Sequence, residues 1–198
     1  MNRLTPIFAL ALVLLASACG TSPPVHYYSL KSTVAPPADT DTERRIVGFG
    51  PLDFPGYLKR PQIVTRKADG EITIDDFRRW AEPLDEAVHR IVAASVEGLV
   101  DNVSVVSYPY HTMIKPEYRV YGDVVRFDVD EAGNAVLRVQ WGVATADRET
   151  VLPPRRAWYT ARASSADTNA IVEALNTLVA DFSNDVAEQL RAALLAER

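Results

Sequence analysis

The three histidines of this 198-residue chain, the residue type most often used as a metal ligand or general base, are scattered along the sequence. His26, His89 and His111 show no spacing typical of a metal site or a general base. Each is expected to be a solvated side chain, with His89 near the exposed face of a helix. Acidic pairs such as Asp75-Asp76 arise by chance in a chain with 26 carboxylates. The sequence also lacks a Gly-x-Ser-x-Gly elbow, a phosphate-binding glycine loop and a His-Glu-x-x-His helix, so we predict that it is not an enzyme and has no catalytic, cofactor-binding or metal-binding residues.

The N-terminus has the pattern of a secretory signal peptide. Arg3 precedes an apolar run, Leu4–Leu15, which is followed by small residues. The run is about a dozen residues long, well below the roughly 20 that a transmembrane helix needs. Residues 1–18 are therefore predicted to be a cleaved signal peptide.

Cys19, the only cysteine, is the residue whose surroundings indicate a covalent modification. The sequence Leu15-Ala16-Ser17-Ala18-Cys19 resembles a lipobox, in which the cysteine carries diacylglycerol and acyl chains such as palmitate. The usual lipobox has leucine three residues before the cysteine, where this chain has Ala16. The alternative is an ordinary secretory signal that leaves Cys19 as a free thiol.

Lipidation of Cys19 would hold the protein stably on a membrane, because each buried CH₂ contributes about 0.8 kcal/mol and two or three chains would be attached. The next residue is Gly20 and not Asp, which by bacterial sorting rules favours the periplasmic face of the outer membrane. Residues 19–26 are polar and contain two prolines, so we expect them to form a lipidated tether.

The charge balance argues against nucleic acid as a partner. Without residues 1–18 the chain keeps 20 Lys and Arg against 26 Asp and Glu, a formal charge of −6 on 180 residues. Proteins that bind polyphosphate backbones carry clustered, net positive charge. A single cysteine also forbids an internal disulfide, so the core of one domain, residues 27–198, must supply the stability.

The mature chain begins with short strand patterns and a helix. Strand-forming runs are separated by turn residues such as Asp69-Gly70, and residues 31–44, with Pro36 and Pro37, are predicted to be a loop. Residues at helical spacing from Leu84 to Leu99 predict a first helix that begins at Pro83, with Gly98 and Asp101-Asn102 as its ending signals. The strands expected in this half cover residues 27–30, 46–50, 62–66 and 71–74.

Three longer strands and a second helix follow. The strands are expected at 118–129, 135–145 and 158–164, with turns at 130–134 and Pro153-Pro154. In the middle strand Leu137, Val139, Trp141 and Val143 alternate with Arg138, Gln140 and Gly142, which indicates one buried and one wet face. The second helix begins at Asp167, a good N-cap, and is about 30 residues long. The fold class is therefore α+β, a mostly antiparallel sheet covered on one face by two helices, in a single domain.

Three surface features leave two interpretations each. Six basic residues between Lys59 and Arg79 could meet anionic lipid or an acidic protein, or they could be surface charge interspersed with acids. The aromatic loop Tyr108–His111 could be an interface, or its rings could pin the loop to the sheet. The long second helix could overhang the domain as a partner site, or its end could fray.

Two blocks of sequence resemble a known family. Residues 54–66, FPGYLKRPQIVTR, resemble a signature of the PqiC-like ABC-transport auxiliary lipoproteins. Residues 80–84, WAEPL, resemble the next block of that family, and the lipobox followed by residues 27–30, YYSL, resembles its start. The family more often has Leu-Pro and an acidic residue where this chain has Phe54-Pro55 and Lys59.

The resemblance implies an α+β domain attached to the outer membrane, with an Mce-domain protein that spans the periplasm and an inner-membrane ABC transporter as partners. In such an Mce or Pqi lipid transport system, the lipoprotein docks the conduit to the outer membrane, as a ring of copies, and lipid moves between the two membranes. The candidate partner-binding residues are Tyr57, Leu58, Arg60, Pro61, Gln62, Arg66 and Trp80.

The alternative is that those residues have only a structural role: a buried Trp80 against the first helix and a rigid turn at Pro61 would give the same sequence. Two other functions compete with docking. A stand-alone lipid-binding or envelope-assembly lipoprotein would need an apolar groove between sheet and helices, and a periplasmic hydrolase would need catalytic residues.

Overall fold

The computed structural model describes residues 23–35, 43–111, 113–147 and 149–196. The predicted signal peptide, Cys19 and the first part of the predicted tether lie outside the described residues, as does the middle of the loop predicted at 31–44. No helix in the described ranges is both long enough and apolar enough to cross a membrane.

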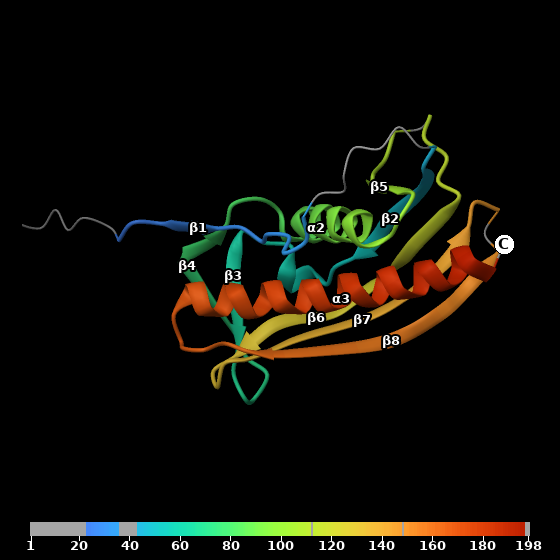
Figure 1. Cartoon of the computed structure of the whole chain (residues 1–198). Coiled ribbons are helices and arrows are strands. Elements are labelled where there is room, and N and C mark those ends of the chain that lie inside the picture. The colour runs from blue at the N-terminus through green and yellow to red at the C-terminus, as the bar shows by residue number, and fades with distance from the viewer. Residues whose placement is uncertain (1–22, 36–42, 112, 148, 197–198) are drawn as a thin grey trace, which may run out of the picture.

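One mixed sheet and two long helices make up the domain (Figure 1). The helices are α2 (Leu84–Leu99) and α3 (Thr168–Ala196), and a short 3-10 helix, η1 (Gly56–Leu58), precedes the third strand. The strands are β1 (His26–Tyr28), β2 (Arg45–Asp53), β3 (Gln62–Arg66), β4 (Ile72–Trp80), β5 (Val103–Ser107), β6 (Tyr118–Asp130), β7 (Asn134–Thr145) and β8 (Thr150–Arg162).

Strand β6 organises the sheet. One edge of β6 pairs with β7 along nearly its whole length, and β8 extends this antiparallel ladder. The other edge pairs in parallel with two strands, with β2 near the start of β6 and with β3 at its end. Strand β5 joins β2 in parallel, β4 joins β3 antiparallel and β1 joins β4 in parallel. The sheet is therefore mixed, and its longest ladders are antiparallel.

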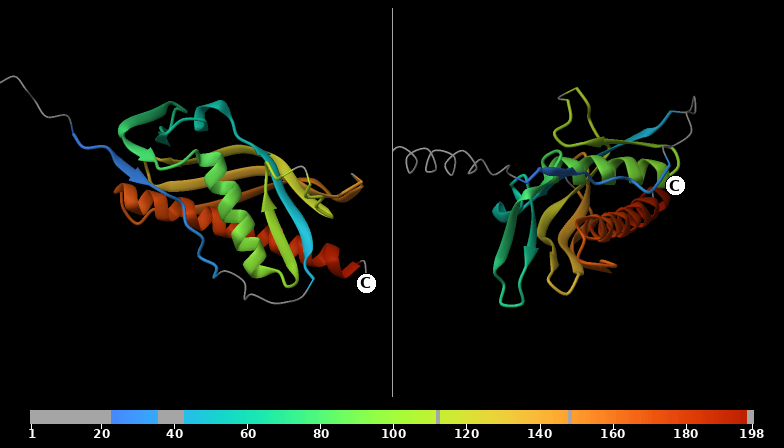
Figure 2. Two further views of the ribbon diagram at one scale, coloured as in Figure 1. Left: turned by 90° about the horizontal axis from the view of Figure 1, so that it is seen from above. Right: turned by 90° about the vertical axis from the view of Figure 1, so that its left-hand side faces the viewer.

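Both helices pack on the same face of this sheet and share one core (Figure 2). Phe182 of α3 lies at its centre, with ring centroids 5.7 Å from Trp141, 5.9 Å from Tyr159 and 6.2 Å from Phe49. The alternation predicted for 135–145 is confirmed for Leu137, Val139, Trp141 and Val143, which are all buried under the helices. On the other face Gln140 is exposed and Arg138 half-buried, but Gly142 is buried, contrary to the prediction.

The prediction of a turn at Pro153-Pro154 is wrong, because this region belongs to strand β8. These prolines lie inside the strand, which begins at Thr150 and not at Trp158. Proline lacks the N–H that a central strand must donate, so it is tolerated here because β8 pairs only with β7. Strand β5 was not expected, because the run Val-Ser-Val-Val-Ser is short and pairs with β2, far away in the sequence.

The second helix follows the prediction closely. The backbone N–H of Asn169 donates to Oδ1 of Asp167 at 2.8 Å, which confirms the N-cap. The helix contains 29 residues, and Ala193 and Leu194 near its end still pack against the core. The described helix therefore stays on the domain almost to its C-terminus and does not form a long overhang.

His89 contradicts the prediction of a solvated side chain. It is buried between sheet and helix, and its Nε2 accepts the backbone N–H of Leu52 at 3.1 Å. Its ring also makes edge contacts with Phe49 and Phe54. A β-bulge in β2, where Gly50 has φ +105°, brings this backbone close to the histidine, and a Cβ at Gly50 would lie 3.1 Å from Nε2.

Burial lowers the pKa of His89 below its ordinary value of 6.5, although the nearby Asp85 opposes this shift. The folded state therefore prefers the neutral ring, which is also the form that accepts the hydrogen bond. Stability from this preference is complete above about pH 6.5 and is lost as the pH falls toward the folded-state pKa.

We expect the free energy of unfolding to fall more steeply below pH 6.5 in the wild type than in His89→Gln. Glutamine offers an acceptor to the Leu52 N–H but does not titrate in this range. Denaturant unfolding at a series of pH values measures both slopes. Equal slopes would show that His89 does not contribute to the acid sensitivity of the fold.

Candidate docking site

The two sequence blocks that carry the family resemblance meet around one surface pocket. Its volume is about 380 Å³. The chain after η1 forms one side, and the end of β4 with the start of α2 forms the other. The lining residues are Lys59, Arg60, Pro61, Trp80, Ala81, Glu82, Pro83, Leu84 and Asp85.

Backbone hydrogen bonds fix the two sides of the pocket relative to each other. The N–H of Trp80 donates to the carbonyl of Pro61 at 2.6 Å, and the N–H of Ala81 donates to Tyr28 at 2.8 Å. Tyr28 belongs to β1, which pairs with the last three residues of β4. The pocket therefore lies beside the first strand of the mature domain, close in sequence to the lipid anchor predicted at Cys19.

Two of the seven candidate contacts are buried. Leu58 is 3% exposed and belongs to the hydrophobic core, so it is not available for direct contact with a partner. Trp80 is 6% exposed and also packs in the core, as the structural alternative proposed, while it contributes to the lining of the pocket. These two residues shape the site from beneath.

Tyr57 and Arg66 are both bound to a buried carboxylate that sequence reasoning missed. Asp128 of β6 is buried, and its Oδ2 accepts the Tyr57 hydroxyl at 3.0 Å and Nη2 of Arg66 at 2.7 Å. Its Oδ1 accepts Nε of Arg126 at 2.7 Å. The alternation of β6 would place Asp128 on the wet face, and the close spacing of Arg126 and Asp128 was the only signal in the sequence.

The Asp128 cluster also affects the pKa values of its partners. Burial raises the pKa of the Tyr57 hydroxyl, and the neighbouring Asp128 charge raises it further. The hydrogen bonds to Asp128 raise the pKa of Arg66. Tyr57 therefore stays a neutral donor and Arg66 a cation, which holds the segment between η1 and β3 against β6.

Arg60, Pro61 and Gln62 remain as candidates for contact from the original seven. Pro61 is exposed, and Gln62 donates to Asp76 at 3.0 Å. The Nε of Arg60 is buried with no hydrogen-bond partner among the described residues. The Arg60 side chain as a whole is only half-buried, so its charge is a candidate partner for an acidic group from outside.

Some basic residues near the pocket form ion pairs and others do not. Arg66, Lys67 and Arg78 form ion pairs with Asp128, Glu71 and Asp75, so interspersed charge describes most of the basic stretch. Within the described ranges no ion pair involves Lys59 or Arg60. On the opposite wall, Glu82 is paired with Arg90.

The aromatic loop at 108–111 is pinned to the sheet. The Tyr108 and Tyr110 rings form an edge contact at 5.9 Å, and Arg119 of β6 lies 5.9 Å from the Tyr110 centroid. Tyr110 also lies against Gly48, where an added Cβ would approach its ring to 3.0 Å. This arrangement supports the structural interpretation of the loop, although Tyr108 is partly exposed.

The core offers little space for a ligand. The cavity between sheet and helices measures about 10 Å³, near the minimum of about 10–15 Å³ that one water needs. Among the described residues, no three His, Cys, Asp or Glu side chains are grouped so that they could hold a metal ion. The cavity is lined by Leu52, Phe54, Val88, Val124, Phe127, Leu137, Val179 and Phe182.

Comparison with known proteins gives a family and a fold. The sequence profile of the ABC-type transport auxiliary lipoprotein component family matches residues 28–187. The fold is similar to the crystal structure of an uncharacterized protein, with a TM-score of 0.71 and 18% identity over 85% of this chain and 99% of the other. It is also similar to protein XCC0632 from Xanthomonas campestris, with a TM-score of 0.70 and 19% identity over 87% and 98% of the two chains. A search of curated proteins found no significant match.

We expect Asp128→Ala to lower the free energy of unfolding by about 2–4 kcal/mol, because it leaves Arg66 and Arg126 without their carboxylate. The value is set below the usual range for a fully buried pair because the side chains of Arg66 and Arg126 are 24% and 23% exposed. The matched control is Asp123→Ala, an exposed carboxylate on the same strand, which should change stability by less than about 0.5 kcal/mol. Equal losses in denaturant unfolding would contradict a structural role for the cluster.

Proposed function

Because the chain belongs to the family of ABC-type transport auxiliary lipoprotein components, we propose that it docks a periplasm-spanning Mce-domain protein to the outer membrane. In this role it serves an inner-membrane ABC transporter and supports the movement of lipid between the two membranes. The protein itself contributes a contact surface and a membrane anchor, and no catalysis.

The observation that carries the proposal is the convergence of the two family blocks on one pocket. Residues 54–66 and 80–84 are separated in the sequence by most of β4 and by the turn at Gly70, yet both line the same surface depression. Its volume of about 380 Å³ lies at the lower end of the range of about 300–1,000 Å³ for ligand pockets. A pocket of this size suits one or two side chains of a partner protein.

The chemistry of the pocket favours an apolar side chain next to an acidic one. Trp80, Pro83 and Leu84 offer apolar surface, while Lys59 and Arg60 stand at one side without ion-pair partners in the described structure. Central apolar anchors surrounded by polar groups dominate the energetics of many protein interfaces. We therefore expect the partner to insert an aliphatic or aromatic residue and to pair a carboxylate with Arg60.

The position of the pocket fits an anchored docking protein. Trp80 pairs with Tyr28, which lies nine residues after Cys19. At no more than about 3.6 Å per residue, the pocket is within roughly 30 Å of the lipidated residue. A partner bound here would be held close to the membrane that carries the anchor.

The stand-alone lipid-binding alternative is less well supported. It needs an apolar groove between sheet and helices, and the cavity at that place measures about 10 Å³. A protein that carried lipid within its fold would need far more room than a single water occupies. The docking proposal requires no such cavity.

The test is a mild crosslink and pull-down of the lipidated protein from its own cells. The wild type should recover an Mce-domain protein, and Arg60→Glu and Ala81→Trp should each reduce recovery about tenfold or more, the equivalent of about 1.4 kcal/mol. Arg60→Glu reverses the cation beside the pocket, and Ala81→Trp fills the pocket from an exposed position. Lys115→Glu makes the same charge change at an exposed site remote in sequence and should bind normally.

The possible outcomes distinguish a wrong function from a wrong contact site. If the wild type recovers lipid but no envelope-spanning protein, the docking function is wrong. If the wild type recovers the Mce protein and both pocket variants recover it equally well, the function stands and the pocket is not the contact site.

A further inference from the structure

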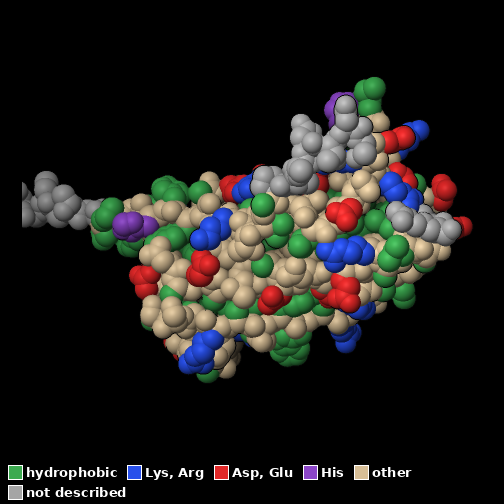
Figure 3. Space-filling model, viewed as in Figure 1, with side chains coloured by type: hydrophobic (Ala, Val, Ile, Leu, Met, Phe, Trp, Pro, Cys, Tyr) green, Lys and Arg blue, Asp and Glu red, His purple; other side chains and the backbone are tan. Residues whose placement is uncertain are grey.

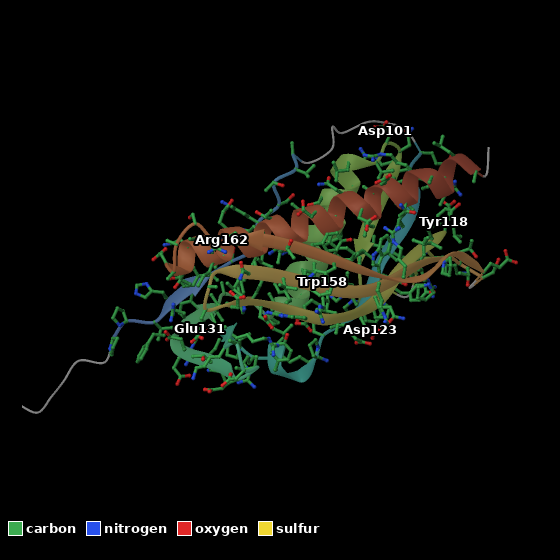
Figure 4. All side chains as sticks on the ribbon, turned by 90° about the horizontal axis from the view of Figure 1, so that it is seen from below. Asp101, Tyr118, Asp123, Glu131, Trp158 and Arg162 are labelled. Carbon is green, nitrogen blue, oxygen red and sulfur yellow. The ribbon has the colours of Figure 1, made fainter. Side chains whose placement is uncertain are left out.

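The face of the sheet opposite the helices is open over β6, β7 and β8. Figure 4 looks onto this face, and Trp158 lies near its middle with no helix in front of the strands. The side chain of Trp158 is 60% exposed, and that of Val125 on β6 is 57% exposed. A large exposed indole is unusual on a wet sheet face, because most tryptophans are largely buried.

Arginines surround this tryptophan. The guanidinium of Arg138 lies 3.6 Å from the centre of the Trp158 ring, a close cation–π contact. Among the residues that the structure describes, the buried Nε of Arg138 has no hydrogen-bond partner, and neither Arg138 nor Arg156 forms an ion pair. A shallow groove of about 430 Å³ runs between Val125, Arg138, Val139, Gln140, Arg156, Ala157 and Trp158.

The two sides of the domain differ in charge. On the open face the register places Asp123, Gln140 and Arg156 in one row and Arg126, Arg138 and Trp158 in the next. Asp123 is the exposed carboxylate among them, since Asp128 is buried and paired with Arg66 and Arg126.

The opposite side carries the outer surface of α3, where Glu173, Asp181 and Glu188 are exposed. Figure 3 looks at the domain at right angles to Figure 4, with α3 toward the viewer, and shows acidic side chains spaced over that surface with basic ones between them. Lys31 is paired there with Glu173, and Arg191 donates to the carbonyl of Leu99. The open sheet face is therefore the better match for a negatively charged surface.

We propose that the open face of β6, β7 and β8 rests on an anionic phospholipid bilayer, with Trp158 at the depth of the headgroups and Arg138 and Arg156 on lipid phosphates. Tryptophan is enriched at membrane interfaces because its ring is apolar and its N–H is polar, and arginine binds phosphate with a planar fork of donors. The acidic side of α3 then faces away from the membrane.

The short anchor supplies the second argument. The predicted lipid on Cys19 and the start of β1 at His26 are seven residues apart, at most about 25 Å. A domain held this close to a bilayer must present some surface to it. The face with an exposed indole and unpaired arginines gains from that contact, whereas a face bearing carboxylates is repelled by anionic lipid.

The experiment uses the mature lipidated protein in vesicles of phosphatidylethanolamine and phosphatidylglycerol whose acyl chains carry bromine near the headgroup. Bromine quenches a nearby tryptophan, and the chain has three, of which Trp80 and Trp141 are buried. We expect the wild type to lose roughly a third of its fluorescence, the share of one tryptophan in three. Trp158→Phe, at an exposed position, should show no such loss.

Charge variants test the lipid contact separately from the fold. Arg138→Glu with Arg156→Glu should at least halve the quenching, as should replacement of phosphatidylglycerol by phosphatidylcholine. Lys31→Glu, on the α3 side, should leave it unchanged. Near-ultraviolet circular dichroism of the buried Trp141 confirms that each variant is folded.

Two outcomes would overturn the proposal. In the first, Trp158 of the anchored protein stays accessible to aqueous iodide and is not quenched by brominated lipid. In the second, it becomes shielded only when an envelope protein is added, which would make the open face a protein interface. Neither outcome depends on whether the pocket at Arg60 binds an Mce-domain protein.

Discussion

Burying a carboxylate costs free energy unless hydrogen-bond partners replace water, and Asp128 obtains three partners from two different parts of the chain. Arg126 comes from its own strand, while Tyr57 and Arg66 come from η1 and β3. The pairing fixes where η1 and β3 lie relative to β6. Strands β2 and β3 pair with the same edge of β6, and a stretch of β6 between these two pairings has no partner strand on that edge. The Asp128 cluster holds the chain that connects β2 to β3 along this stretch.

The proposed docking pocket depends on the same constraint. Lys59, Arg60 and Pro61 lie between Tyr57 and Arg66, so both ends of this short segment are tied to Asp128. The bond from Trp80 to the Pro61 carbonyl then joins the segment to β4 and α2. A site built in this way is already formed before a partner arrives, which reduces the entropy cost of binding.

Much of the fold follows from local sequence patterns. Alternation in β7, the Asp167 cap and the Asp69-Gly70 turn are local signals, and the structure confirms them. Residues whose roles depend on distant partners were missed or misplaced. His89 is buried because a bulge in β2 brings it a backbone donor, and Asp128 is buried because Arg66 pairs with it across 62 residues. In the site, the sequence located the two blocks but could not distinguish buried Trp80 and Leu58 from half-buried Arg60 and exposed Pro61.

The two prolines in β8 affect how the anchored protein meets its neighbours on the membrane. Lipid-anchored proteins share a two-dimensional layer, where identical chains collide often and in similar orientations. The outer edge of β8 is a long row of backbone groups that a neighbour's strand could pair with. Pro153 and Pro154 lie near the start of β8, where its register against β7 shifts, and an irregular, proline-bearing stretch is a poor template for another strand. They therefore protect the crowded, anchored protein from strand-to-strand aggregation.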